Sequence, residues 1–390
     1  MTHLSPGIRA VEPYPFEDLD RRVKAALDAG RELVDLGVGD PRDETPAFIR
    51  RALVDALEPS SSYPRAAGLP ALREAIAGWV GRRFDVTLDP DTQVLPTLGS
   101  KEIVFSLGGY VADPTAGRDT VLVTAPGYPV PERGAGFTGL RAVRLPLEAD
   151  RGFLPDLDAI DGATWERTAI LWVNFPNNPT GAVAPLAFLR DAAERCRRHG
   201  VLLASDEAYS ELWFGDAPPA SALQTGDLTN VVAINTLSKR SNMTGYRSGF
   251  VAGDPALIGA IRNLRPAVGV TPQLFVQRAS IAAWNDEEHV EASRARYAER
   301  RRLFLDLFAR HGIDVAGSEG TFYLWVRVPG GRPSTAWAYE LLDRADVVSA
   351  PGSFFGAEGE GYVRMAMVPP LDACRRAAER LDHVLAEVPA

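Results

Sequence analysis

The feature that most constrains this chain is a regular alternation of short apolar runs and helical patterns from residue 90 to residue 260. The apolar runs are rich in Val, Ile and Leu and show little polar alternation, which is typical of strands buried on both faces. We expect seven strands: Gln93–Pro96, Thr120–Thr124, Arg141–Leu145, Ala169–Val173, Val201–Ser205, Val231–Asn235 and Ser248–Ala252. This alternation predicts a mostly parallel sheet covered by helices.

The two ends of the chain have a different pattern. Thr45-Pro46 followed by apolar residues at helical spacing predicts a helix with Pro in its first turn. A long charged helix is expected at Glu287–Arg310, suited to crossing between two domains. The expected elements after it are Phe322–Val328 (strand), Thr335–Arg344 (helix), Tyr362–Met367 (strand) and Leu371–Glu387 (helix). We therefore predict a large α/β domain over residues 45–290, and a smaller α+β domain built from residues 1–44 and 291–390.

Composition excludes several classes of protein. The chain is acidic, with a formal net charge of −9, which disfavours nucleic acid or an anionic membrane as the main partner. Two cysteines, Cys196 and Cys374, give no disulfide framework, and the five histidines lack the spacing of a metal site. The first 15 residues lack the pattern of a signal peptide, and the longest uncharged stretch, 168–189, contains three prolines. We expect a soluble cytoplasmic protein without a metal.

One lysine stands out by its neighbours. Lys239 follows an expected strand, lies beside Ser238, and precedes Arg247 by eight positions. A lysine in such a place is ordinarily a solvated loop charge. Hydroxyl groups and an arginine near it suit a phosphate-bearing ligand. In a cationic, partly desolvated pocket its pKa would be lowered, which makes the amine a nucleophile able to form a Schiff base.

Four further polar clusters occur at the ends of expected elements. Asp206 ends a strand, where a helix-capping role is the alternative, and Asn174–Gly181 has the composition of a turn. Pro96–Glu102 opens a helix whose free N–H groups suit an anion. Arg364 would be either a solvated strand tip or a clamp for a carboxylate. Together with Lys239 they indicate one crevice at the carboxyl ends of parallel strands.

The combination resembles a known family. The motifs N-N-P-T-G, D-E-A-Y and S-K-x(7)-R, with the late arginine, resemble the fold-type I aminotransferases that use pyridoxal 5'-phosphate. The resemblance covers nearly the whole chain. It implies the PLP-dependent transferase fold type I, with a mostly parallel seven-stranded sheet between helices and a smaller α+β domain. It also implies an enzyme that moves an amino group between glutamate or 2-oxoglutarate and an amino or keto acid.

The resemblance also implies a role for particular residues. Lys239 would bind the cofactor covalently and shuttle the proton, and Asp206 would keep the pyridine nitrogen protonated. Tyr209 and Asn178 would hydrogen-bond the phenolic oxygen of the cofactor ring. Tyr128 would stack on the face of that ring; the alternative for Tyr128 is a place in the core. The groups expected around the phosphate are Arg247, Ser238, Thr236, Ser100 and, with its side chain undecided, Lys101.

Two further implications concern the substrate and the partner. Arg364 would clamp the substrate α-carboxylate, helped by Asn178 and the backbone of Gly39. Tyr63 would cross a homodimer interface to the phosphate bound by the neighbouring subunit. The active sites would then be shared between two copies of the chain.

Longer stretches resemble the N-succinyldiaminopimelate aminotransferases of lysine biosynthesis. They are Pro13-Tyr14-Pro15-Phe16, Tyr209–Phe214, Ser238–Asn242, Ala279–Glu287 and Phe322–Trp325. This resemblance implies N-succinyl-LL-2,6-diaminopimelate as the best substrate and requires a second cation for its distal carboxylates. The candidates for that cation are Arg22, Arg65, Arg240 and Arg265.

Alternative functions stay open at this point. The chain could act on LL-diaminopimelate, aspartate or alanine, or it could be a pyridoxal-phosphate lyase on the same fold. A non-enzymatic regulator that senses an effector with this fold would carry a DNA-binding module. The roughly 30 residues before the first strand are too few for the usual helix-turn-helix domain.

Overall fold

A seven-stranded sheet forms the centre of the computed structural model, which describes residues 2–9 and 16–387. The strand order is β2-β8-β7-β6-β5-β3-β4, with β8 antiparallel to both of its neighbours and the other pairs parallel. The strands are β2 (Val94–Thr97), β3 (Thr120–Ala125), β4 (Arg141–Pro146), β5 (Thr168–Asn174), β6 (Leu202–Asp206), β7 (Val231–Thr236) and β8 (Gly249–Gly253). The predicted α/β class with a mostly parallel sheet is confirmed.

Burial on both faces holds for six of these strands but not for β4. Strands β2, β3 and β5 to β8 are almost entirely buried, whereas in β4 only Leu145 is buried. The prediction was wrong for β4, which lies at one edge of the sheet with β3 as its single neighbouring strand. The other edge strand, β2, is buried because Val94 packs among apolar residues of 70–84 and Leu95 packs among apolar residues of 255–268.

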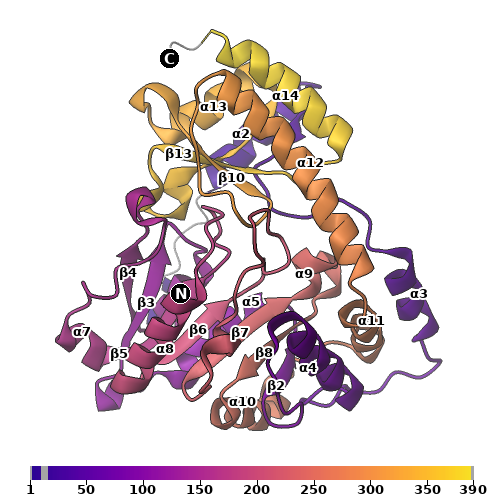
Figure 1. Cartoon of the computed structure of the whole chain (residues 1–390), viewed down its shortest axis with the longest axis vertical. Coiled ribbons are helices and arrows are strands. Elements are labelled where there is room, and N and C mark those ends of the chain that lie inside the picture. The colour runs from indigo at the N-terminus through magenta and orange to yellow at the C-terminus, as the bar shows by residue number, and fades with distance from the viewer. Residues whose placement is uncertain (1, 10–15, 388–390) are drawn as a thin grey trace.

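Helices cover both faces of the sheet (Figure 1). In β5, Ile170 and Trp172 pack on one side against α5 (Lys101–Val111), α6 (Val130–Phe137) and α10 (Pro255–Val268). Leu171 and Val173 point to the other side, toward α8 (Leu186–His199), because side chains alternate along a strand. Further along that side lie α4 (Pro70–Phe84) and α11 (Leu274–Trp284).

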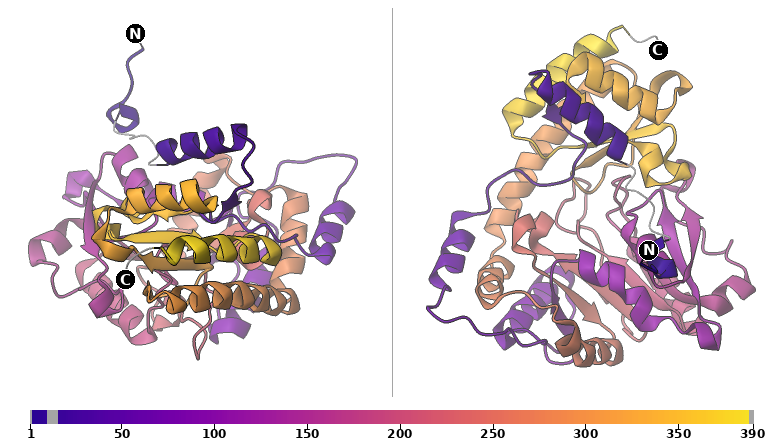
Figure 2. Two further views of the ribbon diagram at one scale, coloured as in Figure 1. Left: turned by 90° about the horizontal axis from the view of Figure 1, so that it is seen from above. Right: turned by 180° about the vertical axis from the view of Figure 1, so that it is seen from behind.

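A second, smaller sheet has the order β12-β13-β10-β9 and is antiparallel throughout. Its strands are β9 (Val315–Ala316), β10 (Tyr323–Arg327), β12 (Ala350–Pro351) and β13 (Tyr362–Ala366). Around it lie α2 (Glu17–Asp28), α13 (Ser334–Ala345) and α14 (Leu371–Leu385), as Figure 2 shows from above and behind. The N-terminal segment joins this region because β1 (Val34–Asp35) pairs with β11 (Val347–Val348).

The long helix α12 (Glu288–Arg310) runs from the region of α11 to the smaller sheet (Figure 1). The remaining helices are α1 (Pro6–Arg9), α3 (Ala47–Asp55), α7 (Gly162–Arg167) and α9 (Leu237–Arg240). The domain limits expected at residues 44/45 and 290/291 stay a prediction. Residues 13–15 of the N-terminal stretch quoted above lie outside the described residues.

The start of α3 differs from the expectation. Pro46 precedes the helix in an extended conformation, with φ −50° and ψ 140°, so it does not occupy the first turn. The hydroxyl of Thr45 donates to the carbonyl oxygen of Asn242 at 2.6 Å. This bond ties the chain before α3 to the loop that follows α9.

Arg240 anchors α9, the one-turn helix that carries Lys239. Its side chain is 1% exposed, and its guanidinium lies 5.1 Å from the ring centre of Trp284 and 5.7 Å from that of Trp79. It donates to the carbonyl oxygen of Ala283 at 2.6 Å and to Glu287 at 2.8 Å. The orientation of α9 therefore depends on the junction between α11 and α12.

We expect Arg240→Met to lower the free energy of unfolding by about 3 kcal/mol, because it leaves buried acceptors without a donor. Urea denaturation measures this loss. The matched control is Arg198→Met on the exposed face of α8, where the pair with Glu194 is solvated and the change should stay within about 0.5 kcal/mol. Equal effects of the two substitutions would contradict the anchoring role of Arg240.

Candidate active site

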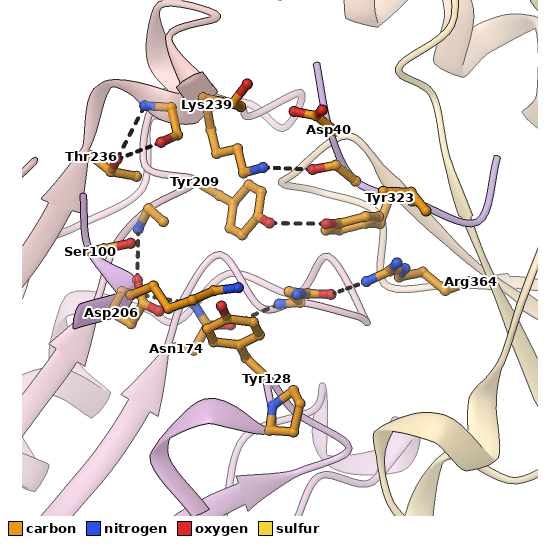
Figure 3. Close-up of a pocket in the computed structure, with 18 of the residues that line it drawn as sticks. Asp40, Ser100, Tyr128, Asn174, Asp206, Tyr209, Thr236, Lys239, Tyr323 and Arg364 are labelled. Carbon is orange, nitrogen blue, oxygen red and sulfur yellow. Dashed lines mark hydrogen bonds between the residues drawn. The ribbon is translucent and has the colours of Figure 1, made fainter. Parts of the chain in front are cut away.

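A cavity of about 540 Å³ lies where the strands of the large sheet end, facing the smaller sheet (Figure 3). Twelve of the thirteen predicted site residues line it. They are Gly39, Ser100, Lys101, Tyr128, Asn178, Asp206, Tyr209, Thr236, Ser238, Lys239, Arg247 and Arg364. The exception is Tyr63, which is fully exposed in the segment between α3 and α4.

Lys239 reaches into the cavity from α9, directly after β7. Its Nζ donates to the carbonyl oxygen of Gly39 at 2.6 Å. Burial lowers the pKa of Lys239 to about 8; the carboxylate of Asp40 opposes that shift, and the charges of Arg364 and its cationic neighbours add to it. A substantial fraction of the amine is thus neutral near physiological pH, as a nucleophile must be.

Asp206 is the buried acid of the cavity. It ends β6, is 6% exposed, and its Oδ1 accepts the N–H of Ala208 at 3.2 Å. Burial raises the pKa of Asp206 to about 6, and no ion pair to it is found among residues 2–9 and 16–387. A ligand with a protonated ring nitrogen would supply the missing positive charge.

The acid that follows in the sequence has a different environment. Glu207 accepts hydrogen bonds from the hydroxyl of Ser205 at 2.9 Å and from the N–H of Ala222 at 2.7 Å. It does not line the cavity, and burial raises its pKa to about 7. Of the two acids in D-E-A-Y, only Asp206 faces the site.

The turn between β2 and α5 forms one end of the cavity. Gly99 has a φ of +71°, and a Cβ on it would lie 2.3 Å from Nη2 of Arg247, so the close approach of the guanidinium requires glycine. Arg247 also donates to the hydroxyl of Ser238 at 3.5 Å. Ser100 precedes the first turn of α5, whose N–H groups have no intrahelical partners. An arginine, hydroxyl groups and free amides together fit a phosphate group.

Arg364 lies at the opposite end, on β13. It is 6% exposed, donates to Oδ1 of Asn178 at 2.9 Å and donates to the carbonyl oxygen of Gly37 at 2.6 Å. Its buried Nε has no hydrogen-bond partner in the described part of the chain. Arg364 also lines the cavity, and a guanidinium in that place fits a carboxylate ligand.

Sequence reasoning missed two residues that link the others. Asn174 donates to the carbonyl oxygen of Asp206 at 2.8 Å and accepts the N–H of Asn178 at 2.9 Å. Tyr323 places its hydroxyl 3.1 Å from that of Tyr209. Asn174 opens the turn-like cluster and could have been singled out there. Tyr323 lies in an apolar run, where an aromatic residue indicates only a core position.

None of the four arginines proposed to read a distal carboxylate lines the cavity. Arg240 is the anchor described above, and Arg265 pairs with Glu102 at 2.5 Å. Arg22 lies over the ring of Tyr339 at 4.1 Å, and Arg65 is exposed near Tyr63. The expectation of a second arginine from these positions is wrong for the cavity of a single chain. Each basic group is used elsewhere in the fold or faces solvent.

Comparisons with known proteins identify the family. The model of the family "Aminotransferase class I and II" matches residues 31–381, so the chain belongs to that family. It is 37% identical over 388 residues to the LL-diaminopimelate aminotransferase of Aquifex aeolicus, covering 98% of this chain and 100% of that one. The aminotransferase of Neisseria meningitidis is 35% identical with a TM-score of 0.90, covering 98% and 100% of the two chains. Apo-BacF of Bacillus subtilis is 33% identical with a TM-score of 0.92, covering 98% of both chains.

The chain is therefore a fold-type I aminotransferase, and its cofactor is pyridoxal 5'-phosphate. When bound, this cofactor acts as the electron sink for the carbanion formed at the substrate Cα. The buried acid, the amine and the anion-binding turn described above fit its ring nitrogen, aldehyde and phosphate. The described residues contain no group of side chains suited to a metal ion and no helix able to span a membrane.

Asp206→Asn should change the stability of the apoenzyme in a pH-dependent way. The carboxyl group has a pKa of about 6 in the folded chain, above its usual value of 3.8. Its burial therefore costs stability that develops as pH rises between these two values and is complete above them. The variant should be more stable than wild type by up to about 3 kcal/mol at pH 8, with the difference lost near pH 4. Urea denaturation of both apoproteins tests this, with the exposed Asp216→Asn as control. A difference that is equal at the two pH values would contradict it.

Proposed function

We propose that this aminotransferase acts in lysine biosynthesis and moves an amino group reversibly between LL-diaminopimelate and 2-oxoglutarate. The products are glutamate and the 2-amino-6-oxo acid derived from LL-diaminopimelate. The observation that carries the proposal is the charge at the cavity mouth, where Asp20 and Asp40 line the wall and are exposed. LL-diaminopimelate has a distal ammonium group, which two carboxylates would attract. In the N-succinyl form an amide replaces that ammonium and a carboxylate is added, which they would repel.

The similar protein of Aquifex aeolicus is an LL-diaminopimelate aminotransferase, which supports this choice of substrate. The absence of Arg22, Arg65, Arg240 and Arg265 from the cavity lining supports it too, because the succinylated substrate would need further cations. A lyase on the same fold would form no 2-oxoglutarate from glutamate, and the family assignment favours amino transfer over that alternative.

We assign the residues of the cavity the following roles. Lys239 binds the cofactor and carries the proton to and from the substrate Cα, since its amine is neutral in part near pH 8. Asp206 keeps the ring nitrogen protonated, and Tyr209 and Asn178 donate to the phenolic oxygen. Arg364, with Asn178 and the backbone of Gly39, holds the substrate α-carboxylate.

The other lining residues hold the cofactor in place. Tyr128 would stack on the ring face, and the Nζ of Lys101 is 6.0 Å from the centre of the Tyr128 ring. The phosphate would be bound by Arg247, Ser238 and Thr236 and by the backbone of Ser100 and Lys101. Thr236 Oγ1 accepts the N–H of Ser238 at 3.2 Å, which holds both hydroxyl groups at the start of α9.

A panel of amino donors tests the substrate. Wild type should convert LL-diaminopimelate with a kcat/KM at least about tenfold above that for N-succinyl-LL-diaminopimelate, aspartate or alanine, with 2-oxoglutarate as acceptor and glutamate as the measured product. Asp20→Asn should lower this kcat/KM about tenfold, an ion-pair effect of about 1.4 kcal/mol. Its activity on alanine, which has no distal ammonium, should be unchanged. Preference for the succinylated donor would contradict the proposal.

We also propose a homodimer with shared active sites, located in the cytoplasm. Tyr63 is 100% exposed, and Val54 and Leu57 nearby are 62% and 57% exposed. A group of large apolar side chains open to solvent in one chain fits an interface with a second copy. Two buried free cysteines fit a reducing compartment.

Tyr63→Phe tests the shared site. Removing one hydroxyl should weaken cofactor retention about tenfold, if that group donates to the phosphate in the partner subunit. The dimer itself should persist in analytical ultracentrifugation, because the ring remains. Wild-type protein that sediments as a monomer, or a variant with unchanged cofactor affinity, would rule out this role.

A further inference from the structure

Tyr323 occupies a position in the cavity that the roles above leave unused. It is the first residue of β10 and is 4% exposed. In the pairing of β10 with β13, Arg364 lies opposite Trp325, which follows Tyr323 by two residues. Figure 3 shows Tyr323 with its hydroxyl pointing toward that of Tyr209.

The hydroxyl group of Tyr323 contacts the hydroxyl of Tyr209 at 3.1 Å. A phenol has one proton to donate. When Tyr209 donates its proton to the phenolic oxygen of the cofactor, its own oxygen can accept the proton of Tyr323. Such a chain of two donors polarises the second O–H bond and strengthens its hydrogen bond.

The ring of Tyr323 contacts the carboxylate clamp. The guanidinium carbon of Arg364 lies 4.2 Å from the centre of this ring and 4.6 Å from that of Phe355. A guanidinium that faces two aromatic rings is held in a fixed plane by cation–π attraction. The ring of Tyr323 therefore helps to hold the plane of Arg364, together with the hydrogen bonds to Asn178 and Gly37, and the Tyr323 hydroxyl takes no part in this ring contact.

The backbone next to Lys239 is also shaped by this side chain. A Cβ on Gly39 would lie 1.8 Å from the hydroxyl oxygen of Tyr323, so residue 39 must be glycine while Tyr323 is in place. The carbonyl oxygen of Gly39 is the acceptor for Nζ of Lys239. Tyr323 thus contacts Tyr209, Arg364 and Gly39. These three residues are assigned above to the cofactor ring and the substrate carboxylate, and Gly39 also contacts Lys239.

We propose that Tyr323 is a positioning residue whose two parts have separate functions. Its hydroxyl strengthens the hydrogen bond from Tyr209 to the phenolic oxygen of the cofactor, and its ring fixes the plane of Arg364 for the substrate carboxylate. This inference rests on the roles proposed above for Tyr209 and Arg364. The charged and titratable groups that face Tyr209 are Tyr323, Arg364 and Asp206.

Two substitutions separate the two parts. Tyr323→Phe removes the hydroxyl and keeps the ring, whereas Tyr323→Leu removes both. The holoenzyme variants are compared by pH titration of the visible absorbance of the bound cofactor and by the KM for glutamate. A donor to the phenolic oxygen stabilises its anionic form, so loss of that donor raises the pKa seen in the titration.

The expected results differ between the variants. Tyr323→Phe should raise the absorbance pKa by about 0.5 to 1 unit and leave the KM within about twofold. Tyr323→Leu should show the same pKa change and a KM raised about tenfold, since the clamp loses its fixed plane. The matched control is Tyr297→Phe, which removes a buried hydroxyl that has no hydrogen-bond partner in the described chain. It should change neither quantity.

Tyr209→Phe distinguishes failure of this inference from failure of the underlying roles. If Tyr209→Phe raises the absorbance pKa and Tyr323→Phe does not, the role of the Tyr323 hydroxyl is overturned and that of Tyr209 stands. If neither raises it, both roles are overturned. An unchanged KM in Tyr323→Leu overturns the role of the ring, and a KM that rises equally in Tyr323→Phe overturns the separation of functions.

Discussion

The hydrogen bond from Arg364 to Asn178 joins the two parts of the chain that enclose the cavity. Arg364 belongs to β13 in the smaller sheet, and Asn178 follows β5 in the large one; the two atoms are 2.9 Å apart. Through Asn174 this contact continues to the backbone of Asp206, at the end of β6. Arg364 and Asp206 therefore belong to one buried polar network that lines the cavity. Such a network restricts the orientation of the side chains that it joins.

Burial shifts the two central ionisable groups in opposite directions. It lowers the pKa of Lys239 to about 8 and raises that of Asp206 to about 6, because an apolar surrounding disfavours both charged forms. A ligand with a cationic atom beside Asp206 would offset the cost of burying the Asp206 carboxylate, and anionic groups elsewhere on the ligand would suit the cationic side chains of the cavity. The cavity is consequently built for a ligand of mixed charge, although the chain as a whole carries a net charge of −9.

Strand ends were the part of the site that the sequence predicted well. The apolar runs of β5, β6 and β7 locate their last residues within one position, and the polar groups of the site follow there. Tyr323 could not be found in this way, because its orientation depends on the pairing of β10 with β13, which joins residues about 40 positions apart. Arg240 and Arg247 show the same limit. Both are basic and close in sequence, yet tertiary packing buries Arg240 against two tryptophans and turns Arg247 to the cavity.

Asp20 and Asp40, the two exposed acids that line the cavity, bear on both the attraction of substrate and the pKa of Lys239. Carboxylates there would attract the ammonium group of the proposed substrate. Asp40 also raises the pKa of Lys239, whose amine reacts only in its neutral form. A buried acid at the same distance would keep the lysine charged. Asp20 and Asp40 are exposed, so water screens their effect on the buried amine while they still face the entrance. Asp20 lies on α2, outside the loop that contacts Lys239, and its substitution therefore separates attraction of substrate from tuning of the lysine.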